Sequence, residues 1–439
     1  MRQIMTCWLK EFDNPSNKYR PLPFWSWNDR LNPKVLRWQI QEMHKAGLGG
    51  YFMHARGGLK TEYLRDEWFK CIANCIDEGK KVGLNSWVYD ESGWPSGFAG
   101  GLVTAHGDKY HGRWITLEDY SRDCNKHSGY KQSDNVLGIY VIDQAGESKR
   151  ITFEQAEVYQ ETGKRVVVIK HHANRDYIDV MNSEAVELFI HYTHEKYFKL
   201  FESEFGNGLK GFFTDEPRFS GSIEGDVPWS YVLPGEFQKR YKQDLLSVLP
   251  LLFLPCTGYV EVRHQFWQMV NDLFVTNFIK RINDWCKEHN CKLTGHIMME
   301  ESIFSQMTST GGVMPFYEHM DIPGIDWLRR KISSPIVPKQ VSSVASQLGK
   351  PFVLTESYAL SGWDVSFEDL KWIAEWQYVN GVNLMCQHLQ GYTIRGLRKR
   401  DYPPSLFIQQ PWWNEYKIFN DYLARLGVVL SHGKQVVDV

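Results

Sequence analysis

Short apolar runs alternate with longer amphipathic segments along most of this 439-residue chain. The first pair shows the pattern: residues 23–28 (PFWSWN) form an apolar run, and residues 32–47 carry apolar side chains at helical spacing. Asn32 suits a helix cap, Pro33 a first helical position and Gly47 a helix end. Alternation of this kind predicts repeated βα units around a parallel sheet.

Eight apolar runs have strand character, which is the number of strands in a TIM barrel. The fold class predicted is therefore α/β, a TIM (β/α)8 barrel. The expected strands are 23–28, 49–55, 84–91, 211–217, 292–298, 321–328, 351–357 and 382–389. The expected helices are 32–47, 65–83, 183–206 with Ser183 as cap, 260–289, 335–349, 366–381 and 410–433.

The βα rhythm breaks after the third expected strand. A glycine-rich loop (92–101) is followed by three β-like segments at 112–118, 135–143 and 165–173. This pattern predicts a small β-subdomain inserted after strand 3, with an independent domain as the alternative. The expected division is 1–107 for the first βα units, 108–176 for the insert and 177–439 for the rest of the barrel. Residues 217–257 form a second long excursion.

Two strand ends carry carboxyl groups after buried apolar residues: GFFTDEP (211–217) and PFVLTES (351–357). Expected strands four and seven lie nearly opposite in an eight-stranded ring. Glycoside hydrolysis needs two carboxyl groups facing each other across the scissile bond, one protonated and one ionised. The sequence therefore predicts Glu216 and Glu356 as the catalytic pair. Asp215 either raises the pKa of Glu216 or, facing the other way, holds a loop.

The neighbours of each glutamate suggest its role. The phenylalanine strand and Asp215 tend to keep Glu216 protonated, which suits a general acid. The hydroxyl groups of Thr355 and Ser357 could donate hydrogen bonds to Glu356 and keep it ionised, which suits a general base. This division of roles suits both inversion and retention at the anomeric carbon.

Polar or aromatic residues occupy every other expected strand end. Side chains at the carboxyl ends of barrel strands meet in one pocket, so we expect them to bind substrate. For a single such residue a hydrogen bond at the rim is the simpler explanation, and for His54 and Asp326 it is the preferred one. At least two of the tryptophans should offer flat apolar faces to a sugar ring. The predicted binding residues are Trp25, Trp27, Asn28, His54, Arg56, Tyr89, Asp90, Glu91, Trp94, Asp215, His296, Glu300, Glu301, Asp326, Trp363 and His388.

Composition narrows the partners. Aromatic residues make up 14% of the chain, including 17 Trp, which is equally compatible with an aromatic-rich core and with a carbohydrate ligand such as an oligosaccharide or glycoside. The net charge is −2 and no basic stripe occurs, so no nucleic-acid partner is expected. No apolar run reaches the roughly 20 residues of a membrane span, so no membrane partner is expected. The polar N-terminus and the eight Cys without a CxxC motif predict a cytoplasmic protein, with Cys71 and Cys75 as packed thiols.

Two further motifs have simpler explanations. The segment HYTHE (191–195) has His191, His194 and Glu195 at helical spacing, but a solvated helix face is a better interpretation than a metal site. The basic cluster at 394–405 could bind an acidic substrate group, although a salt-bridged loop is preferred.

Several long motifs carry a family resemblance: PFWSWND, VYDESGWPSGFAGG, GFFTDEP, TGHIMMEES, TESYALSGWDVSFEDLKW and YTIRGLRKRDYPPS. Over residues 21–430 the chain resembles the barrel of glycoside hydrolase family 106, the α-L-rhamnosidases. The resemblance implies an inverting, exo-acting glycosidase with Glu216 as acid, Glu356 as base and a calcium ion near the terminal sugar, with no ligands assigned. Family members usually continue into further domains, and QVVDV (435–439) is typical of the start of another strand.

Two alternatives stay open at this stage. One is a retaining glycosidase of a related barrel clan, in which Glu356 is the nucleophile. The other is a non-catalytic carbohydrate-binding barrel, which would not need two opposed glutamates.

Overall fold

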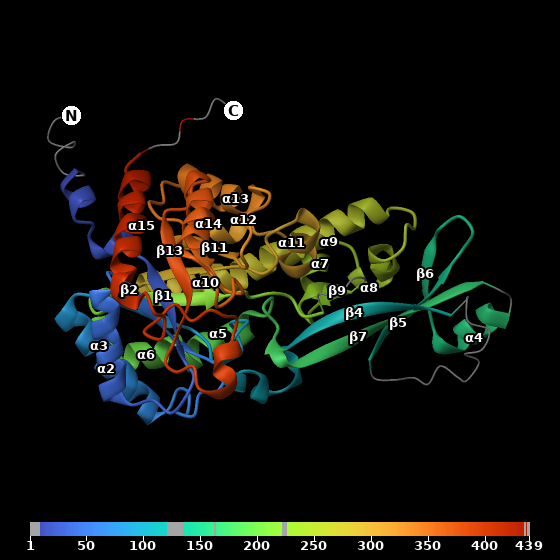
Figure 1. Cartoon of the computed structure of the whole chain (residues 1–439). Coiled ribbons are helices and arrows are strands. Elements are labelled where there is room, and N and C mark those ends of the chain that lie inside the picture. The colour runs from blue at the N-terminus through green and yellow to red at the C-terminus, as the bar shows by residue number, and fades with distance from the viewer. Residues whose placement is uncertain (1–8, 121–134, 162–163, 222–225, 434–435, 437–439) are drawn as a thin grey trace.

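The architecture is a closed parallel barrel with an arm extending from one side (Figure 1). The computed structural model describes residues 9–120, 135–161, 164–221, 226–433 and 436. Barrel neighbours follow sequence order and all pair in parallel, which confirms the predicted TIM barrel. Its strands are β1 (Leu22–Trp27), β2 (Gly50–Ala55), β3 (Asn85–Tyr89), β8 (Leu209–Asp215), β10 (Lys292–His296), β11 (Ile322–Trp327), β12 (Leu354–Ser357) and β13 (Leu384–Gly391).

Helices surround the barrel, and several begin and end where the local sequence predicts. The Asn32 side chain accepts a hydrogen bond from the amide of Lys34, and Gly83 ends its helix in the left-handed conformation. Ser366 and Asp369 form a capping box. The helices are α2 (Pro33–Lys45), α3 (Asp66–Val82), α5 (Ser183–Tyr192), α6 (His194–Phe201), α10 (Arg281–Glu288), α13 (Ile336–Gln347), α14 (Phe367–Val379) and α15 (Tyr416–Ser431).

The helix expected at 183–206 is divided in two. It breaks at Thr193, whose hydroxyl donates a hydrogen bond to the carbonyl of Phe189 and contacts the ring of His194. A threonine hydroxyl that bonds the backbone in this way competes with regular helix geometry. The cap is Asn182 and not Ser183, because the Asn182 side chain accepts from the amide of Glu184.

The arm in Figure 1 consists largely of a second, five-stranded sheet that follows β3. Its own core includes Ile139, Val141, Val166 and Val168. The strand β9, from the second excursion, pairs with β4, so the sheet also recruits residues beyond 176. The proposed division of the chain at 107 and 176 stays a prediction. The elements are β4 (His111–Asp119), β5 (Val136–Ile142), β6 (Ser148–Ile151), α4 (Phe153–Glu161), β7 (Arg165–Ile178) and β9 (Val227–Trp229).

Further helices fill the two long connections after β8 and β10. One run of helix is nearly continuous, because α9 passes through a π-helical segment (Val275–Lys280) directly into α10. In Figure 1, α7, α8 and α9 lie on the same side of the barrel as the arm. The helices are α7 (Leu233–Tyr241), α8 (Leu245–Val248), α9 (Tyr259–Phe274), α11 (Ile303–Thr310) and α12 (Met314–Glu318).

Side chains of each barrel strand point alternately inward and outward, and this alternation positions the site. In β1, Phe24 belongs to the cluster inside the barrel, whereas Trp25 and Trp27 belong to the layer between strands and helices. The interior cluster also includes Phe52 and Phe213. The interior is therefore packed with side chains, and the site lies at one end of the barrel.

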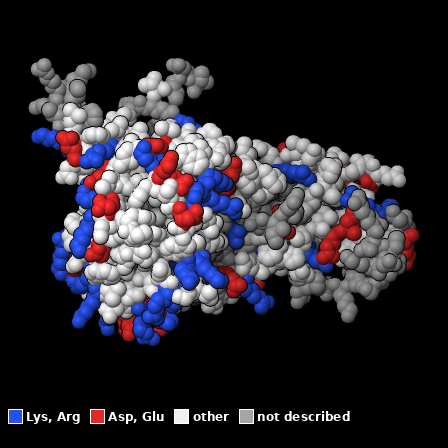
Figure 2. All heavy atoms as spheres, viewed as in Figure 1, with Lys and Arg blue, Asp and Glu red and all other residues white. Residues whose placement is uncertain are grey.

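The surface carries both charge signs. Figure 2 shows Lys and Arg interspersed with Asp and Glu over the displayed face, in keeping with the net charge of −2. None of the helices in the described part of the chain combines the length and the apolar character needed to cross a bilayer.

Candidate active site

A polar layer closes the barrel interior at the carboxyl ends of the strands. Each of its members follows an inward-facing residue by two positions, and so points inward as well. Phe52, Phe213, Leu354 and Cys386 are the inward-facing residues of four strands. The polar residues two positions further along those strands are His54, Asp215, Glu356 and His388.

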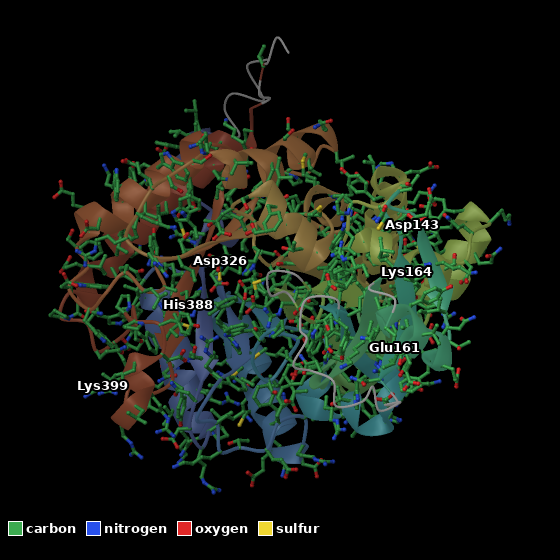
Figure 3. All side chains as sticks on the ribbon, turned by 90° about the vertical axis from the view of Figure 1, so that its right-hand side faces the viewer. Asp143, Glu161, Lys164, Asp326, His388 and Lys399 are labelled. Atoms are coloured by element: carbon green, nitrogen blue, oxygen red, sulfur yellow. The ribbon has the colours of Figure 1, made fainter. Side chains whose placement is uncertain are left out.

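A cavity of about 630 Å³ opens above this layer. In Figure 3, Asp326 and His388 lie near the middle of the view, whereas Asp143, Glu161 and Lys164 of the arm lie to one side. Ten of the predicted site residues line the cavity: Arg56, Trp94, Asp215, Glu216, His296, Glu300, Glu301, Asp326, Glu356 and His388.

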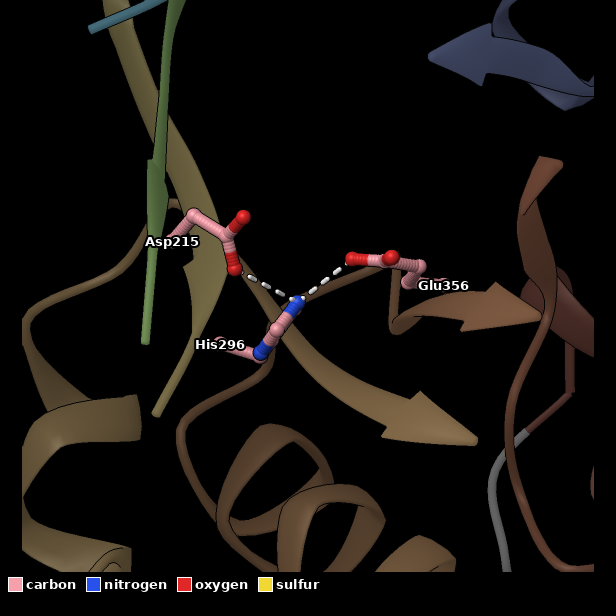
Figure 4. A group of neighbouring side chains, drawn as sticks. All are labelled: Asp215, His296 and Glu356. Atoms are coloured by element: carbon pink, nitrogen blue, oxygen red, sulfur yellow. Dashed lines mark hydrogen bonds and ion pairs between the residues drawn. The ribbon is translucent and has the colours of Figure 1, made fainter. Parts of the chain in front are cut away.

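At the centre, His296 lies between two carboxyl groups (Figure 4). Its Nε2 atom is 2.7 Å from Oε2 of Glu356 and 3.3 Å from Oδ1 of Asp215. Burial opposes a charge on the ring, but the hydrogen bond to Glu356 and the charge of Asp215 outweigh it, so the pKa of His296 is raised well above its usual value. The raised pKa favours the imidazolium form of His296, which holds Asp215 and Glu356 on either side of itself.

Strand register explains how these groups meet. Asp215 and His296 are direct partners in the pairing of β8 with β10, and Asp326 and Glu356 are partners in the pairing of β11 with β12. The hydroxyl of Tyr89 donates a 2.5 Å hydrogen bond to the other oxygen of Asp215. Asp215 therefore faces the pocket, which decides against the alternative that it holds a loop.

Glu216 reaches the same pocket although it is adjacent to Asp215. Neighbouring residues of a strand face opposite ways, but Glu216 follows the end of β8 and has φ of +46°. This left-handed backbone turns the chain, and the Glu216 amide donates to the carbonyl of His296. Burial, followed by the charge of Asp215, raises the pKa of Glu216 to about 8. At neutral pH Glu216 is mostly protonated.

Glu356 has a different source of hydrogen bonds from the one predicted. Thr355 and Ser357 point outward, where both bond to Gln377 of α14. The expectation that their hydroxyl groups hold the Glu356 carboxylate is wrong, because alternate strand residues face away from it. His296 is the donor instead. Burial raises the pKa of Glu356, while the bond from His296 opposes this rise and favours the ionised form.

Several polar atoms in or directly below the cavity floor have no hydrogen-bond partner among the described residues. Among the described residues, neither Oδ1 of Asp326 nor Nδ1 of His388 has a hydrogen-bond partner, and both ring nitrogens of His54 lack one. Burial and then the charge of Glu356 raise the pKa of Asp326 well above its usual value. Burial lowers the pKa of His54 and of His388, so both rings are neutral. Within the described residues the His54 ring makes no rim hydrogen bond, and Asp326 makes one through its backbone amide, which donates to Glu300.

Trp25 and Trp27 do not line the cavity, and the prediction that they bind substrate is wrong. Both are fully buried outside the barrel wall, where the Trp25 indole donates to Gln39 and Trp27 packs on Trp68. Both residues occupy positions of β1 whose side chains point away from the barrel interior. Of the four candidate tryptophans, only Trp94 is among the residues that line the cavity, since Trp363 donates to the carbonyl of Lys399 outside it.

Four other predicted binding residues hold the walls of the site. Asn28 exchanges hydrogen bonds with the backbone of Thr393, and Asp90 accepts from Ser96 behind β3. Tyr89 bonds to Asp215 from below the cavity. The Glu91 carboxylate accepts from five backbone amides, those of Ser92, Gly97, Phe98, Ala99 and Gly100. Glu91 thus fixes the glycine-rich loop that carries Trp94.

Two weaker motifs have structural roles. His191 pairs with Glu195 on an exposed helix face, but His194 is fully buried against Phe212 and does not belong to that solvated face. The basic cluster is a salt-bridged loop: Arg398 and Arg395 approach Asp29, and Asp401 binds Arg56. Cys71 and Cys75 are buried free thiols, as predicted.

Several residues that line the cavity lie in loops beyond the strand ends, where the sequence has no regular hydrophobic pattern that would identify them. The backbone of the structure does identify some of them, because non-glycine residues with left-handed φ are concentrated at functional sites that need a fixed geometry. Five such residues line the cavity: Glu216, Met299, Arg329, Leu360 and Tyr402. Other lining residues that the sequence did not indicate are Arg218, Ile297, Met298, Trp327, Leu328, Lys331, Ser333 and Ala359.

The closed barrel, with opposed carboxyl groups at the carboxyl ends of strands four and seven, defines a glycoside hydrolase barrel. The sequence profile of the α-L-rhamnosidases, glycoside hydrolase family 106, matches residues 159–439. The chain belongs to this family.

Three individual proteins are similar to this chain in structure or in sequence. The rhamnosidase of Novosphingobium sp. PP1Y has a TM-score of 0.70 at 14% identity, covering 97% of this chain and 61% of that one. A β-galactosidase of Marinomonas ef1 has a TM-score of 0.52 at 10% identity, covering 91% and 59%. A putative β-glucuronidase of Formosa agariphila is 25% identical over 233 residues, 49% of this chain and 18% of that protein. The chain thus spans less than two thirds of each, and the structural neighbours define the fold.

The two kinds of tryptophan should respond differently to substitution. Trp25→Ala removes a fully buried ring and should destabilise the protein by about 3–5 kcal/mol, with no change in KM while the protein stays folded. Trp94→Ala removes a half-exposed ring from the cavity and should raise KM with little change in Tm. Thermal melts and initial rates on the same samples measure both. A raised KM for Trp25→Ala at unchanged Tm would contradict this assignment.

Proposed function

We propose that this barrel is the catalytic unit of an inverting, exo-acting α-L-rhamnosidase, with Glu216 as general acid and Glu356 as general base. The observation that carries the proposal is the difference between the environments of the two glutamates. Burial and Asp215 raise the pKa of Glu216 to about 8, whereas Glu356 accepts a hydrogen bond from the imidazolium of His296. One protonated and one ionised carboxyl group are what the reaction requires.

In the proposed reaction, the terminal sugar lies on the cavity floor between the two glutamates. Glu356 takes a proton from a water molecule, whose oxygen attacks the anomeric carbon from the side opposite the departing oxygen. The bond from the anomeric carbon to that oxygen breaks, and Glu216 gives its proton to the oxygen as it leaves. Asp215 and His296 are positioning residues: the first keeps Glu216 protonated and the second keeps Glu356 ionised.

The floor also offers partners for the hydroxyl groups of a sugar. Asp326 and His388 present atoms that have no partner among the described residues. Trp94, Trp327 and Met299 add apolar surface for the sugar faces and a methyl group. A cavity with a polar floor and apolar walls suits a single deoxy-sugar bound at its closed end.

A panel of nitrophenyl glycosides tests the proposal. We expect hydrolysis of the α-L-rhamnoside and little hydrolysis of β-glucuronide, β-galactoside or α-mannoside. If only another glycoside of the panel is hydrolysed, rhamnose is the wrong sugar, but the protein is still a glycosidase. Binding of rhamnose without turnover of any member would favour the non-catalytic carbohydrate-binding barrel.

The pH profile follows from the pKa of Glu216. The acid must be protonated, so kcat/KM should fall on the alkaline side with an apparent pKa of about 8. The charge of Asp215 helps to raise this pKa, so Asp215→Asn should move the alkaline limb to lower pH. The measurement is kcat/KM from pH 5 to 10. An alkaline limb that does not move in Asp215→Asn would contradict the link between the two groups.

The calcium ion that family membership suggests belongs to this proposal. Calcium takes oxygen ligands, and the cavity floor gathers the carboxyl groups of Asp215, Asp326 and Glu356, with Oδ1 of Asp326 lacking a partner among the described residues. His296 lies close enough to Asp215 and Glu356 to share a metal ion with them, but its protonated ring has no lone pair to offer a cation. Asp215 and Asp326 would therefore be the ligands, which leaves Glu356 free to act as the base. A bound calcium ion would offset their mutual repulsion and offer a contact to sugar hydroxyl groups.

Metal removal gives a separate prediction. Dialysis against a chelator should lower both Tm and kcat/KM, and added calcium should restore both, because a ligand of the folded state stabilises it. Asp326→Asn should weaken the Tm increase that calcium produces. An unchanged Tm with and without calcium, at millimolar concentration, would exclude this site for calcium.

A further inference from the structure

Two positively charged side chains at the mouth of the cavity make no polar contact, within the described residues, that would stabilise the fold. Arg329 and Lys331 line the cavity from the segment that follows β11, and both are exposed. Among the described residues, neither side chain takes part in a hydrogen bond or ion pair, whereas the intervening Arg330 is fully engaged. Arg330 lies 2.9 Å from Asp364 and 3.6 Å from Asp369, and donates to the carbonyl of Ser361.

The backbone, and not the charged groups, fixes the positions of these two cations. The amide of Arg329 donates a 2.6 Å hydrogen bond to the carbonyl of Ala359, with Arg329 at φ of +76°. The Trp327 indole donates a 2.9 Å hydrogen bond to the carbonyl of Lys331. A bulky residue persists in left-handed geometry only where its surroundings enforce it, often at a ligand site. The two charged ends are therefore held near the mouth and stay free to bind.

The charge distribution of the cavity restricts what these cations can bind. The floor carries the carboxylates of Asp215 and Glu356, which would repel an anionic group on the terminal sugar. The cations lie beyond the strand ends, toward the open side. In an exo-acting pocket the terminal sugar fills the closed end, and the rest of the substrate extends through the mouth. An anion would therefore be accepted on the sugar beyond the scissile bond.

We propose that Arg329 and Lys331 bind an anionic group, a carboxylate or a sulfate ester, on the sugar that is released with the departing oxygen. The substrate class is then an acidic glycan whose terminal neutral deoxy-sugar is linked to a charged sugar. Arg329 supplies a planar donor fork for such a group and Lys331 a point charge. This inference rests on the proposed function for the identity of the terminal sugar, and it adds the charge of its neighbour.

The test uses three disaccharides that differ in one group. Each has α-L-rhamnose as its terminal sugar; the second sugar is a uronic acid, the methyl ester of that acid, or a sulfated neutral sugar. We expect kcat/KM for the acid or the sulfate to exceed that for the ester by about tenfold or more, the factor expected of one charge-assisted hydrogen bond. The preference should shrink in 0.5 M salt, because both cations are exposed.

Variants assign the preference to residues. Arg329→Gln with Lys331→Gln should bring the ratio of acid to ester to within about twofold, because the charge-assisted bonds are lost. Arg330→Gln, the matched control, should keep the wild-type ratio even if its broken ion pairs lower Tm. A wild-type ratio near one for both anions, or an unchanged ratio in the double variant, would overturn the inference.

The proposed function and this inference can fail separately. If nitrophenyl α-L-rhamnoside is cleaved and the ratio is near one, only the inference fails. If no rhamnoside is cleaved, the proposed function fails, and calorimetric titration with the uncleaved acid and its methyl ester still tests the cations. Tighter binding of the acid, lost in the double variant, would support the anion site. Equal binding would remove it.

Discussion

Glu216→Gln is expected to lower kcat/KM on a sugar-linked rhamnoside by about 10²–10⁴-fold, the usual contribution of a general acid. The amide has nearly the same shape as the carboxyl group but cannot give a proton to the departing oxygen. The buried, left-handed position of Glu216 should tolerate the change, because the amide is neutral like the protonated acid. Tm should therefore remain within a few degrees of the wild-type value.

The leaving group provides an internal check of this role. A nitrophenolate departs with little protonation, so the loss in Glu216→Gln should be much smaller on the nitrophenyl rhamnoside than on the disaccharide. The matched control is Glu368→Gln, at an exposed position in the first turn of α14, which should change neither rate. Equal losses on both substrates would argue that Glu216 is not the acid.

The barrel could be predicted from sequence because its signals are local and repeated. Each strand is a short apolar run and each helix an amphipathic segment, and caps such as Asn32 and Gly83 mark boundaries. Sequence order equals spatial order around the ring, so no long-range pairing had to be guessed. The catalytic candidates followed from the same rule, since strand ends converge on one face.

Errors in the site came from side-chain direction. Counting in steps of two from Phe24 assigns Trp25 and Trp27 to the outer layer, and counting from Phe213 assigns Asp215 to the pocket. The alternation of side chains was present in the sequence, but it can be used only when one knows which residue of each strand points inward. Glu216 does not follow this alternation, because its left-handed backbone turns the chain, and no sequence pattern predicts that turn.

The remaining lining residues lie in loops whose conformation depends on distant contacts. Arg329 is placed by the carbonyl of Ala359 and Arg56 by Asp401, each from another loop of the barrel. His296 was expected only to bind substrate, whereas its contacts with Asp215 and Glu356 require the register of four neighbouring strands. Such pairings are set by tertiary structure, which local propensity does not encode.

Glu356→Gln should lower kcat/KM by a factor as large as that of Glu216→Gln, about 10²–10⁴-fold, for a different reason. The amide cannot remove a proton from the attacking water. It also leaves His296 without one of its two carboxylate partners, so the pKa of His296 should fall in this variant. NMR titration of the histidine ring would show that change independently of turnover.

The stereochemistry of the product decides how Glu356 acts. As a base it works through water, and the first-formed sugar has the opposite anomeric configuration to the substrate. As a nucleophile it would form a glycosyl ester, and the product would keep the configuration of the substrate. Inversion requires about 6.5–9.5 Å between the two carboxyl groups and retention about 5–5.5 Å.

We expect inversion, because the hydrogen bond from His296 stabilises the charge on Glu356 and so lowers its tendency to attack carbon. Proton NMR of the wild-type reaction, recorded before mutarotation, should show the β-anomer of rhamnose first. A fluorinated slow substrate should give no mass increase on the peptide that contains Glu356. Appearance of the α-anomer first, or a sugar adduct on Glu356, would assign the retaining mechanism with Glu356 as nucleophile.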